Sequence, residues 1–212
     1  MMSLLTGMPG DGKSLLAVEL LIKDLIGRLA YVVTNLPLKW PELRAYVMER
    51  RKEVADEFTD LDDDLHVIPD SEVAEFYRFR SGGLVLPHSP DWEVGVDGTK
   101  RLERPVFAQK MKEAFQLIAE KEEYKRPVHY YIDECHEFFS SRDWATNGRG
   151  TLYYATKHRH LRDDVYLITQ HVDQLEKQLR NLVSETHRTR NNIRRNVGLF
   201  SIRPLDDLTE GH

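Results

Sequence analysis

Hydrophobic residues recur along the chain in two alternating patterns, short apolar runs and longer stretches with one apolar face. The short runs predict strands at 2–6, 29–34, 65–68, 128–134 and 164–170. Helical spacing of apolar positions predicts helices at 14–26, 41–58 and 105–124, with a short helix at 72–80. Strands that alternate with helices indicate an α/β fold, in which helices cover both faces of a mostly parallel sheet.

Three stretches fall outside this alternation. Residues 83–102 combine several Gly and Pro residues with apolar positions, which predicts an excursion from the main sheet at about 81–104, shaped as a hairpin. Residues 56–64 are strongly acidic but lack the glycine and the terminal glutamate of a calcium loop, so we expect a solvated loop. A basic segment at 187–195, without the interleaved aromatic residues of a nucleic-acid site, precedes a predicted closing strand at 196–202.

The run from Gly7 to Ser14 matches the P-loop pattern of Gly, four residues and Gly-Lys-Ser, between a predicted strand and a predicted helix. Its glycines let backbone N–H groups approach a polyphosphate, and the positive end of the following helix faces the same phosphates. Lys13 is expected to reach the β- and γ-phosphates, and the Ser14 hydroxyl to bind Mg²⁺. The predicted nucleotide-binding residues are Gly7, Pro9, Gly10, Asp11, Gly12, Lys13, Ser14 and Leu15.

Two adjacent carboxylates, Asp133 and Glu134, end the apolar strand predicted at 128–134. Ligands of parallel sheets collect at the carboxyl ends of the strands. Asp133 is therefore expected to hold Mg²⁺, directly or through water, across from Ser14, and Glu134 to orient and polarise the attacking water. Cys135 and His136 follow at once, but four consecutive residues cannot converge on one ion, so a transition-metal site is disfavoured.

The strand predicted at 164–170 ends in Thr169 and Gln170, either of which could contact the γ-phosphate or the lytic water. Gln170 suits this role because an amide both donates and accepts hydrogen bonds. The basic run at 157–162 lies just before this strand. It could supply an arginine finger, an element worth roughly 10³–10⁵ in rate, or it could be an exposed helix end, and the residues alone leave both open.

Composition narrows the class of protein. The 212 residues suit one domain, and a formal net charge of −5 argues against nonspecific polyanion binding by the chain as a whole. Cys135 is the single cysteine, so no intramolecular disulfide can form, which fits a reducing compartment. No apolar run approaches the ~18 residues of a membrane span, and a P-loop at residue 7 leaves no room for a signal peptide. We expect a soluble single domain over 1–212.

The nucleotide is expected to be ATP. GTP-binding proteins read guanine with the motif Asn/Thr-Lys-x-Asp. Here Thr156-Lys157 is followed by His158-Arg159, so the aspartate is missing. ATP with Mg²⁺ is the remaining expectation.

Together these motifs resemble the N-terminal cytoplasmic ATPase domain of the zonular occludens toxin family, which includes the gene I assembly proteins of filamentous phages. The resemblance covers nearly the whole chain. It rests on the P-loop, on Tyr-Ile-Asp-Glu-Cys-His-Glu-Phe-Phe at 131–139, and on His158-Arg159-His160 leading into 164–170. The segment 131–139 is the specific part. The family usually has Ala where Cys135 stands, a small residue for a small one, and we expect little consequence.

The resemblance implies a RecA-like P-loop NTPase fold of the FtsK/HerA type and an ATP-driven role in phage assembly and secretion. It implies that a transmembrane helix follows this domain, so that this chain is truncated and the full-length protein lies at the cytoplasmic face of the host inner membrane. The implied partners are other phage assembly proteins, coat protein, packaged single-stranded DNA and further copies of the chain in a hexameric ring. In FtsK/HerA-type motors an arginine shortly before the Thr-Gln strand acts across the subunit boundary, and Arg159 matches that position best. The toxin activity belongs to a C-terminal part of certain members and is not expected here.

In this hypothesis the catalytic residues are Lys13, Glu134, Gln170 and Arg159. A DNA translocase of the same superfamily shares all of them. A small-molecule kinase needs a phosphate acceptor rather than an activated water, and Glu134 beside Asp133 disfavours it. A nucleotide-binding scaffold that never hydrolyses is not excluded by any residue.

Overall fold

A parallel sheet forms the centre of the molecule. The computed structural model describes residues 1–54, 61–88, 92–94, 100–102, 104–140 and 144–190. Within these ranges a six-stranded sheet has the order β3-β2-β6-β7-β1-β8, and every neighbouring pair is parallel. The strands are β1 (Met2–Thr6), β2 (Tyr31–Thr34), β3 (Leu65–Val67), β6 (Val128–Ile132), β7 (Asp164–Thr169) and β8 (Glu185–Arg188). All six carboxyl ends therefore lie at one edge of the sheet.

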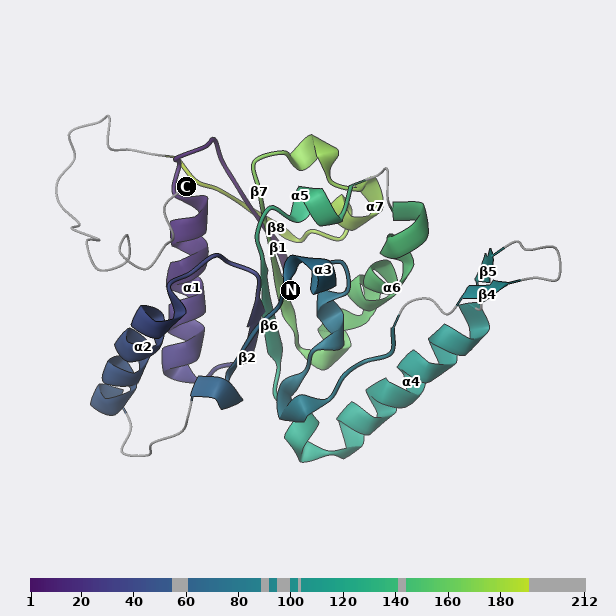
Figure 1. Cartoon of the computed structure of the whole chain (residues 1–212), viewed down its shortest axis with the longest axis horizontal. Coiled ribbons are helices and arrows are strands. Elements are labelled where there is room, and N and C mark those ends of the chain that lie inside the picture. Colours follow the sequence, from purple (N-terminus) through teal and green to yellow (C-terminus); the bar gives the residue numbers. More distant parts are fainter. Residues whose placement is uncertain (55–60, 89–91, 95–99, 103, 141–143, 191–212) are drawn as a thin grey trace.

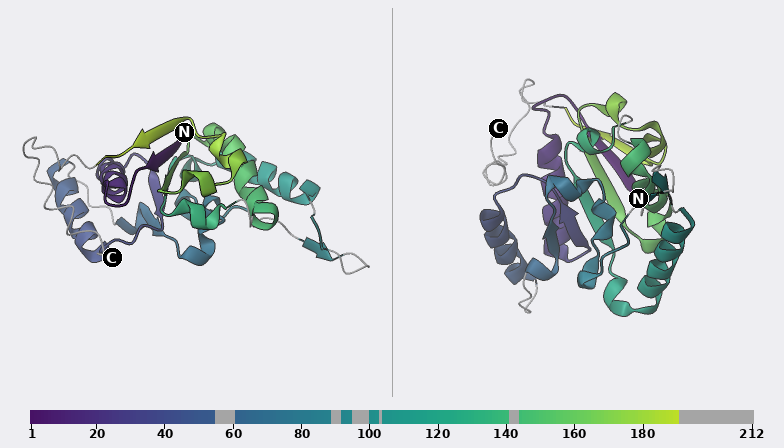
Figure 2. Two further views of the ribbon diagram at one scale, coloured as in Figure 1. Left: turned by 90° about the horizontal axis from the view of Figure 1, so that it is seen from above. Right: turned by 45° about the vertical axis from the view of Figure 1, so that its right-hand side comes forward.

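Helices cover both faces of this sheet, as Figures 1 and 2 show. On one face lie α1 (Lys13–Gly27) and α2 (Trp40–Val54). The elements on the other face are α3 (Asp70–Val73), α4 (Arg104–Glu120), α5 (Cys135–Phe138), α6 (Trp144–Lys157) and α7 (Lys177–Arg180). At the outer end of α4, β4 (Trp92–Val94) and β5 (Lys100–Leu102) pair as an antiparallel hairpin away from the main sheet (Figure 1).

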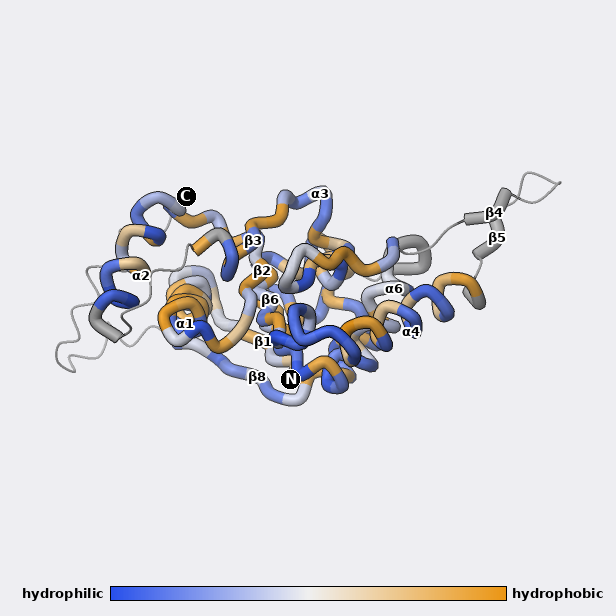
Figure 3. Tube along the Cα trace, turned by 90° about the horizontal axis from the view of Figure 1, so that it is seen from below, coloured by the Kyte–Doolittle hydropathy of each residue, from blue (hydrophilic) through white to orange (hydrophobic). Residues whose placement is uncertain are grey.

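The central strands are apolar on both sides because alternate side chains enter two separate cores. Leu4 of β1, Tyr130 of β6 and Leu167 of β7 pack in the core beneath α4 and α6. Leu5, Tyr131 and Ile168 of the same strands pack against α1, whose trace is largely orange, the colour of hydrophobic residues, in Figure 3. The predicted α/β class, with the P-loop after the first strand, is confirmed as a mostly parallel sheet of the P-loop NTPase type.

The predicted helix at 72–80 is wrong in its extent. The structure has α3 at Asp70–Val73 and a separate 3₁₀ turn at Phe76–Arg78. The carbonyl of Ala74 accepts a hydrogen bond from Thr151 Oγ1 at 2.7 Å, and Arg80 is drawn into the interior. A contact with a residue far along the chain thus ends the helix early.

The prediction of a solvated acidic loop is wrong for Asp64. This side chain is fully buried and forms ion pairs with Arg51 at 2.5 Å, with Arg28 at 3.4 Å and with Arg126. The charge of a carboxylate is stable in the interior only when cations or donors compensate it. Here three arginines from other parts of the chain supply them. Residues 56–60 of the predicted loop lie outside the described residues.

Several elements escaped prediction, among them α6 and β8. Helix α6 contains Gly148 and Gly150, which lower helix propensity, and β8 has the sequence Glu-Thr-His-Arg with all four residues exposed. The four residues of β8 include no apolar side chain, so no alternation marks this strand. The predicted closing strand at 196–202 lies outside the described residues. In the described part of the chain, no helix has the length and apolar character needed to cross a membrane.

Candidate nucleotide-binding site

The fold brings three of the predicted segments to the same edge of the sheet. The P-loop follows β1, Thr169 ends β7 with Gln170 directly after it, and Asp133 and Glu134 follow β6. Strand β7 lies between β1 and β6, with Thr6 of β1 in register with Thr169 and Ile132 of β6 in register with Leu167. The end of β7 is thereby placed between the P-loop and the acidic pair.

The P-loop backbone leaves helix α1 open at its N-terminus. Gly12 precedes the helix with φ 85°, a left-handed conformation that favours glycine, and no side chain caps the first turn. Asp11 Oδ2 accepts a hydrogen bond from Met8 N at 2.9 Å, and Asp11 N donates to Met8 O at 3.1 Å, so the loop closes on itself. Uncapped N–H groups at a helix start form an anion-binding site.

Gly7 is required for a different reason, the close approach of a neighbouring segment. A Cβ atom on Gly7 would lie 2.5 Å from Thr189 Oγ1 and 2.8 Å from Thr189 O. Thr189 continues β8 and donates from its backbone N–H to Thr6 O at 2.8 Å. Only a glycine lets the end of β8 lie against the start of the P-loop.

Lys13 is largely buried, at 8% exposure, and its Nζ donates to Met8 O at 3.3 Å. The ammonium is therefore held at the loop by one neutral carbonyl. A phosphate oxygen offers a stronger, charge-assisted hydrogen bond than a carbonyl does. Lys13 is positioned to exchange one partner for the other.

The acidic pair is held by a residue that the sequence analysis did not identify as functional. Asn35, which follows β2, accepts from Asp133 N through Oδ1 at 2.8 Å and donates to Asp133 O through Nδ2 at 3.3 Å. Asp133 Oδ1 in turn accepts from Glu134 N at 3.0 Å. The two-sided contact with Asn35 fixes the backbone from which both carboxylates project. Asp133 and Ser14 offer carboxylate and hydroxyl oxygens, the donor types that Mg²⁺ takes, so the residues fit that ion.

Glu134 has an unusual backbone and an asymmetric carboxylate. Its φ of 42° is left-handed. The side chain is 42% exposed, yet its Oε2 atom is buried and lacks a hydrogen-bond partner among the described residues. His136 Nδ1 lies 3.3 Å from this oxygen and 2.9 Å from Thr169 Oγ1. One imidazole nitrogen thus touches both the acidic pair and the end of β7.

Cys135, between these groups, is fully buried. Burial raises the pKa of its thiol well above the ordinary value, and the charges of Asp133 and Glu134 raise it further. A thiol held in its neutral form is a poor metal ligand and nucleophile. Across the described ranges, no three His, Cys, Asp or Glu residues are grouped to hold a metal ion.

Arg159 is not part of this constellation within one chain. It is exposed in the 3₁₀ turn His158–Leu161, before the start of β7, and its Nη2 donates to Ser184 Oγ at 3.2 Å. The length of β7 separates it from Thr169, roughly 17 Å at a rise of ~3.3 Å per residue. Gln170, in contrast, follows Thr169 directly at the site and is half-buried.

Strand β8 adds a cation that sequence reasoning missed. Arg188 is in register with Thr6, so one row across the sheet contains Thr169, Thr6 and Arg188. Register partners in parallel strands project toward the same face. Arg188 is exposed and forms no ion pair with the described residues. It therefore stands beside the P-loop as a cation on the side opposite Glu134.

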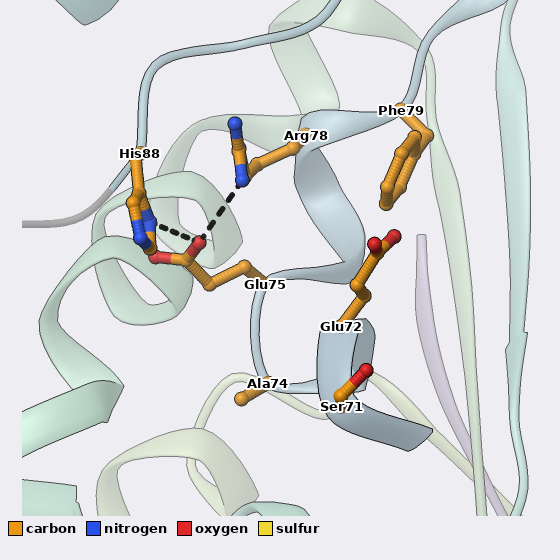
Figure 4. Close-up of a pocket in the computed structure, with 7 residues that line it drawn as sticks. All are labelled: Ser71, Glu72, Ala74, Glu75, Arg78, Phe79 and His88. Atoms are coloured by element: carbon orange, nitrogen blue, oxygen red, sulfur yellow. Dashed lines mark ion pairs between the residues drawn. The ribbon is translucent and has the colours of Figure 1, made fainter. Parts of the chain in front are cut away.

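A separate pocket lies near α3 and the 3₁₀ turn at Phe76–Arg78, shown in Figure 4, with a volume of about 360 Å³. Glu75 in its wall forms ion pairs with Arg78 at 3.6 Å and with His88. None of the predicted nucleotide-binding residues lines it. We therefore assign it no nucleotide.

A sequence model of the family described as zonular occludens toxin (Zot) matches residues 97–204, just over half of the 212-residue chain. The chain belongs to the Zot family. The matched range contains the acidic pair, β7 and β8, whereas the P-loop of this Zot-family domain precedes it. The resemblance drawn from residues 131–139 and 158–170 is thereby confirmed.

Solved structures similar to this chain include another Zot domain and two viral proteins. The N-terminal domain of zonular occludens toxin from Neisseria meningitidis is 17% identical, with 91% of this chain and 78% of that chain covered and a TM-score of 0.45. The DNA-packaging ATPase B204 from Sulfolobus Turreted Icosahedral Virus is 17% identical, with 89% and 76% covered and a TM-score of 0.47. The genome packaging NTPase B204 from Sulfolobus turreted icosahedral virus 2, in complex with ATP-gammaS, is 16% identical, with 89% and 75% covered and a TM-score of 0.45. No curated protein matches the chain.

Proposed function

We propose that this Zot-family domain binds and hydrolyses ATP to power filamentous-phage assembly and secretion at the cytoplasmic face of the inner membrane. One observation carries the hydrolytic part. The P-loop, the polar end of β7 and the acidic pair of β6 meet at one edge of the sheet, with β7 in the middle. The phage-assembly part rests on family membership.

The proposed reaction uses the residues as follows. Polyphosphate binds the uncapped start of α1, and Lys13 moves its ammonium from Met8 O to the β- and γ-phosphates. Glu134 accepts a proton from a water molecule while the water oxygen forms a bond to the γ-phosphorus. The bond between that phosphorus and the leaving oxygen of ADP breaks. Gln170 contacts the γ-phosphate from the end of β7.

Mg²⁺, when bound, neutralises charge on the phosphate oxygens. Ser14 and Asp133 are the residues that would hold it. Asn35 keeps Asp133 in place through two hydrogen bonds to its backbone, at 2.8 and 3.3 Å. Asp133 Oδ1 also accepts from Glu134 N, so the proposed metal ligand and the proposed base share one local framework.

Arg159 is proposed to act on the site of a neighbouring subunit. Its place at the opposite end of β7 supports a role at the site of a second copy rather than at the site of its own chain. An assembled ring, hexameric by analogy with FtsK/HerA-type motors, would supply that neighbour. Hydrolysis should therefore rise more than linearly with protein concentration.

The experiment is phosphate release with Mg-ATP over a range of protein concentrations. The wild-type chain is compared with Lys13→Ala and with Glu134→Gln, and ATP binding is measured separately. We expect both variants to lose at least about 100-fold in rate, while Glu134→Gln retains ATP binding. Wild-type chain that binds ATP but releases no phosphate at any concentration would leave a nucleotide-binding scaffold as the function.

A DNA translocase would use all of these residues as well. Only the effect of DNA on the rate of ATP hydrolysis therefore distinguishes it from a phage-assembly ATPase. Strong stimulation of phosphate release by double-stranded DNA would favour it over phage assembly. Phosphate release in the absence of any acceptor would exclude the small-molecule kinase.

A further inference from the structure

The contact between His136, Glu134 and Thr169 has a specific consequence for the proposed hydrolysis. The Glu134 carboxylate has one buried oxygen, Oε2, on a side chain that is 42% exposed overall. Because one oxygen of the Glu134 carboxylate is buried and the other is not, the two oxygens can have different roles. The outer oxygen is accessible to a water molecule. The inner oxygen faces His136 Nδ1 at 3.3 Å.

We propose that His136 is a positioning residue for Glu134, whose Nδ1–H group holds the inner carboxylate oxygen and links it to the end of β7. This inference rests on the proposed function, because it assigns a partner to the proposed base. Glu134 stands at a left-handed backbone position between the end of β6 and the start of α5. The attraction between Nδ1–H of His136 and Oε2, which lie 3.3 Å apart, restricts the rotation of this carboxylate.

The hydrogen bonds around Thr169 decide which tautomer of His136 can do this. Thr169 Oγ1 already accepts from His171 N at 2.9 Å and lies 2.9 Å from His136 Nδ1. If Nδ1 carries the proton, it can donate to Thr169 Oγ1 and attract Glu134 Oε2. If Nδ1 is bare, it accepts from the Thr169 hydroxyl and turns a lone pair toward the carboxylate, which repels it. Only the Nδ1–H tautomer positions Glu134.

The surroundings favour a fixed ring. The His136 and His171 rings lie 4.8 Å apart at 61°, an edge-to-face arrangement. The His136 side chain is 11% exposed, whereas His171 is exposed. Since Thr169 and Gln170 are adjacent, a γ-phosphate that moves the end of β7 would move His136 and the inner oxygen of Glu134 with it. The base would then be aligned by the presence of the third phosphate.

The first test compares two substitutions at one position. Asparagine at 136 places an amide nitrogen near the position of imidazole Nδ1, whereas glutamine places it near Nε2. We expect His136→Gln to lower kcat by roughly 10–100-fold with a KM for ATP within about twofold of wild type, and His136→Asn to retain most of the activity. Equal loss in both variants, or wild-type kcat in His136→Gln, would overturn the proposal, even where Glu134→Gln confirms ATP hydrolysis.

The second test does not require hydrolysis. Long-range ¹H–¹⁵N spectra of the ¹⁵N-histidine-labelled chain report which ring nitrogen carries the proton, with His136→Asn used to assign the signal. The expected form has a proton on Nδ1, and Glu134→Ala is expected to shift the population toward Nε2–H, because Thr169 can then donate to Nδ1. A wild-type ring protonated only on Nε2 would refute the role of His136 whatever the ATPase result.

Discussion

Asp163 and Arg80 form a buried ion pair whose loss should destabilise the whole sheet. Both side chains have no exposed surface, and Arg80 Nη1 donates to Asp163 Oδ2. Asp163 also accepts from Tyr154 OH at 2.6 Å and from Val128 N at 2.9 Å. The carboxylate therefore ties the segment before β7 to the first residue of β6 and to α6.

The substitution Asp163→Asn removes the negative charge and keeps the shape. An asparagine amide group cannot accept at every contact, and Arg80 remains charged in the interior. Removing one partner of a buried pair costs about 3–5 kcal/mol. For a domain of this size each kcal/mol corresponds to about 2–4 °C in Tm, so we expect Tm to fall by about 6–20 °C.

Thermal unfolding followed by circular dichroism at constant pH measures this fall. Asp173→Asn is the matched control, because it is the same change in an exposed ion pair, with Arg180 at 3.7 Å. We expect that control to change stability by less than about 1 kcal/mol. The double variant Arg80→Met, Asp163→Asn should be more stable than Asp163→Asn alone, because no uncompensated charge remains. Similar Tm values for Asp163→Asn and Asp173→Asn would refute the reasoning.

Two further predictions concern pH and assembly. Burial lowers the pKa of His158 below its ordinary value of 6.5, so the unfolded chain binds more protons and stability falls as the pH drops through about 6.5. His158→Asn, which can still donate to Ala155 O, should flatten the dependence of Tm on pH between 7 and 5, and an unchanged slope would contradict this. Arg159→Ala should slow ATP hydrolysis by about 10³-fold or more, and mixing it with Lys13→Ala should restore part of the activity. A mixture no more active than its separate components would argue against action between subunits.

Local patterns predicted most of the elements and the chemical groups of the site. The strands β1, β6 and β7 are apolar runs with polar ends, and the P-loop is recognisable because its glycines and Lys13 have fixed spacing. The end of each strand could be assigned a function without knowing its neighbours. In contrast, β8 is short and exposed, so no period of apolar residues marked it.

Burial of single charges could not be predicted from such patterns. Asp64 stands in an acidic run that looks solvated, yet three arginines from distant positions surround it. Asp163 likewise meets Arg80 from a position 83 residues away in the chain. Whether an aspartate is exposed or buried depends on which cations the fold brings near it, and sequence neighbours carry no information on that.

The amino-acid sequence by itself thus determined an α/β fold, a P-loop at 7–14 and a pair of carboxylates at a strand end, because each depends on residues close together in the chain. Only the tertiary structure decided that β7 lies between β1 and β6, which sets Thr169 beside His136 and Glu134. It also decided that Asn35 holds Asp133, that Arg188 lies beside the P-loop and that Arg159 lies at the opposite end of β7. The order of strands in a parallel sheet follows from how helices pack across it, and that packing joins residues more than a hundred positions apart.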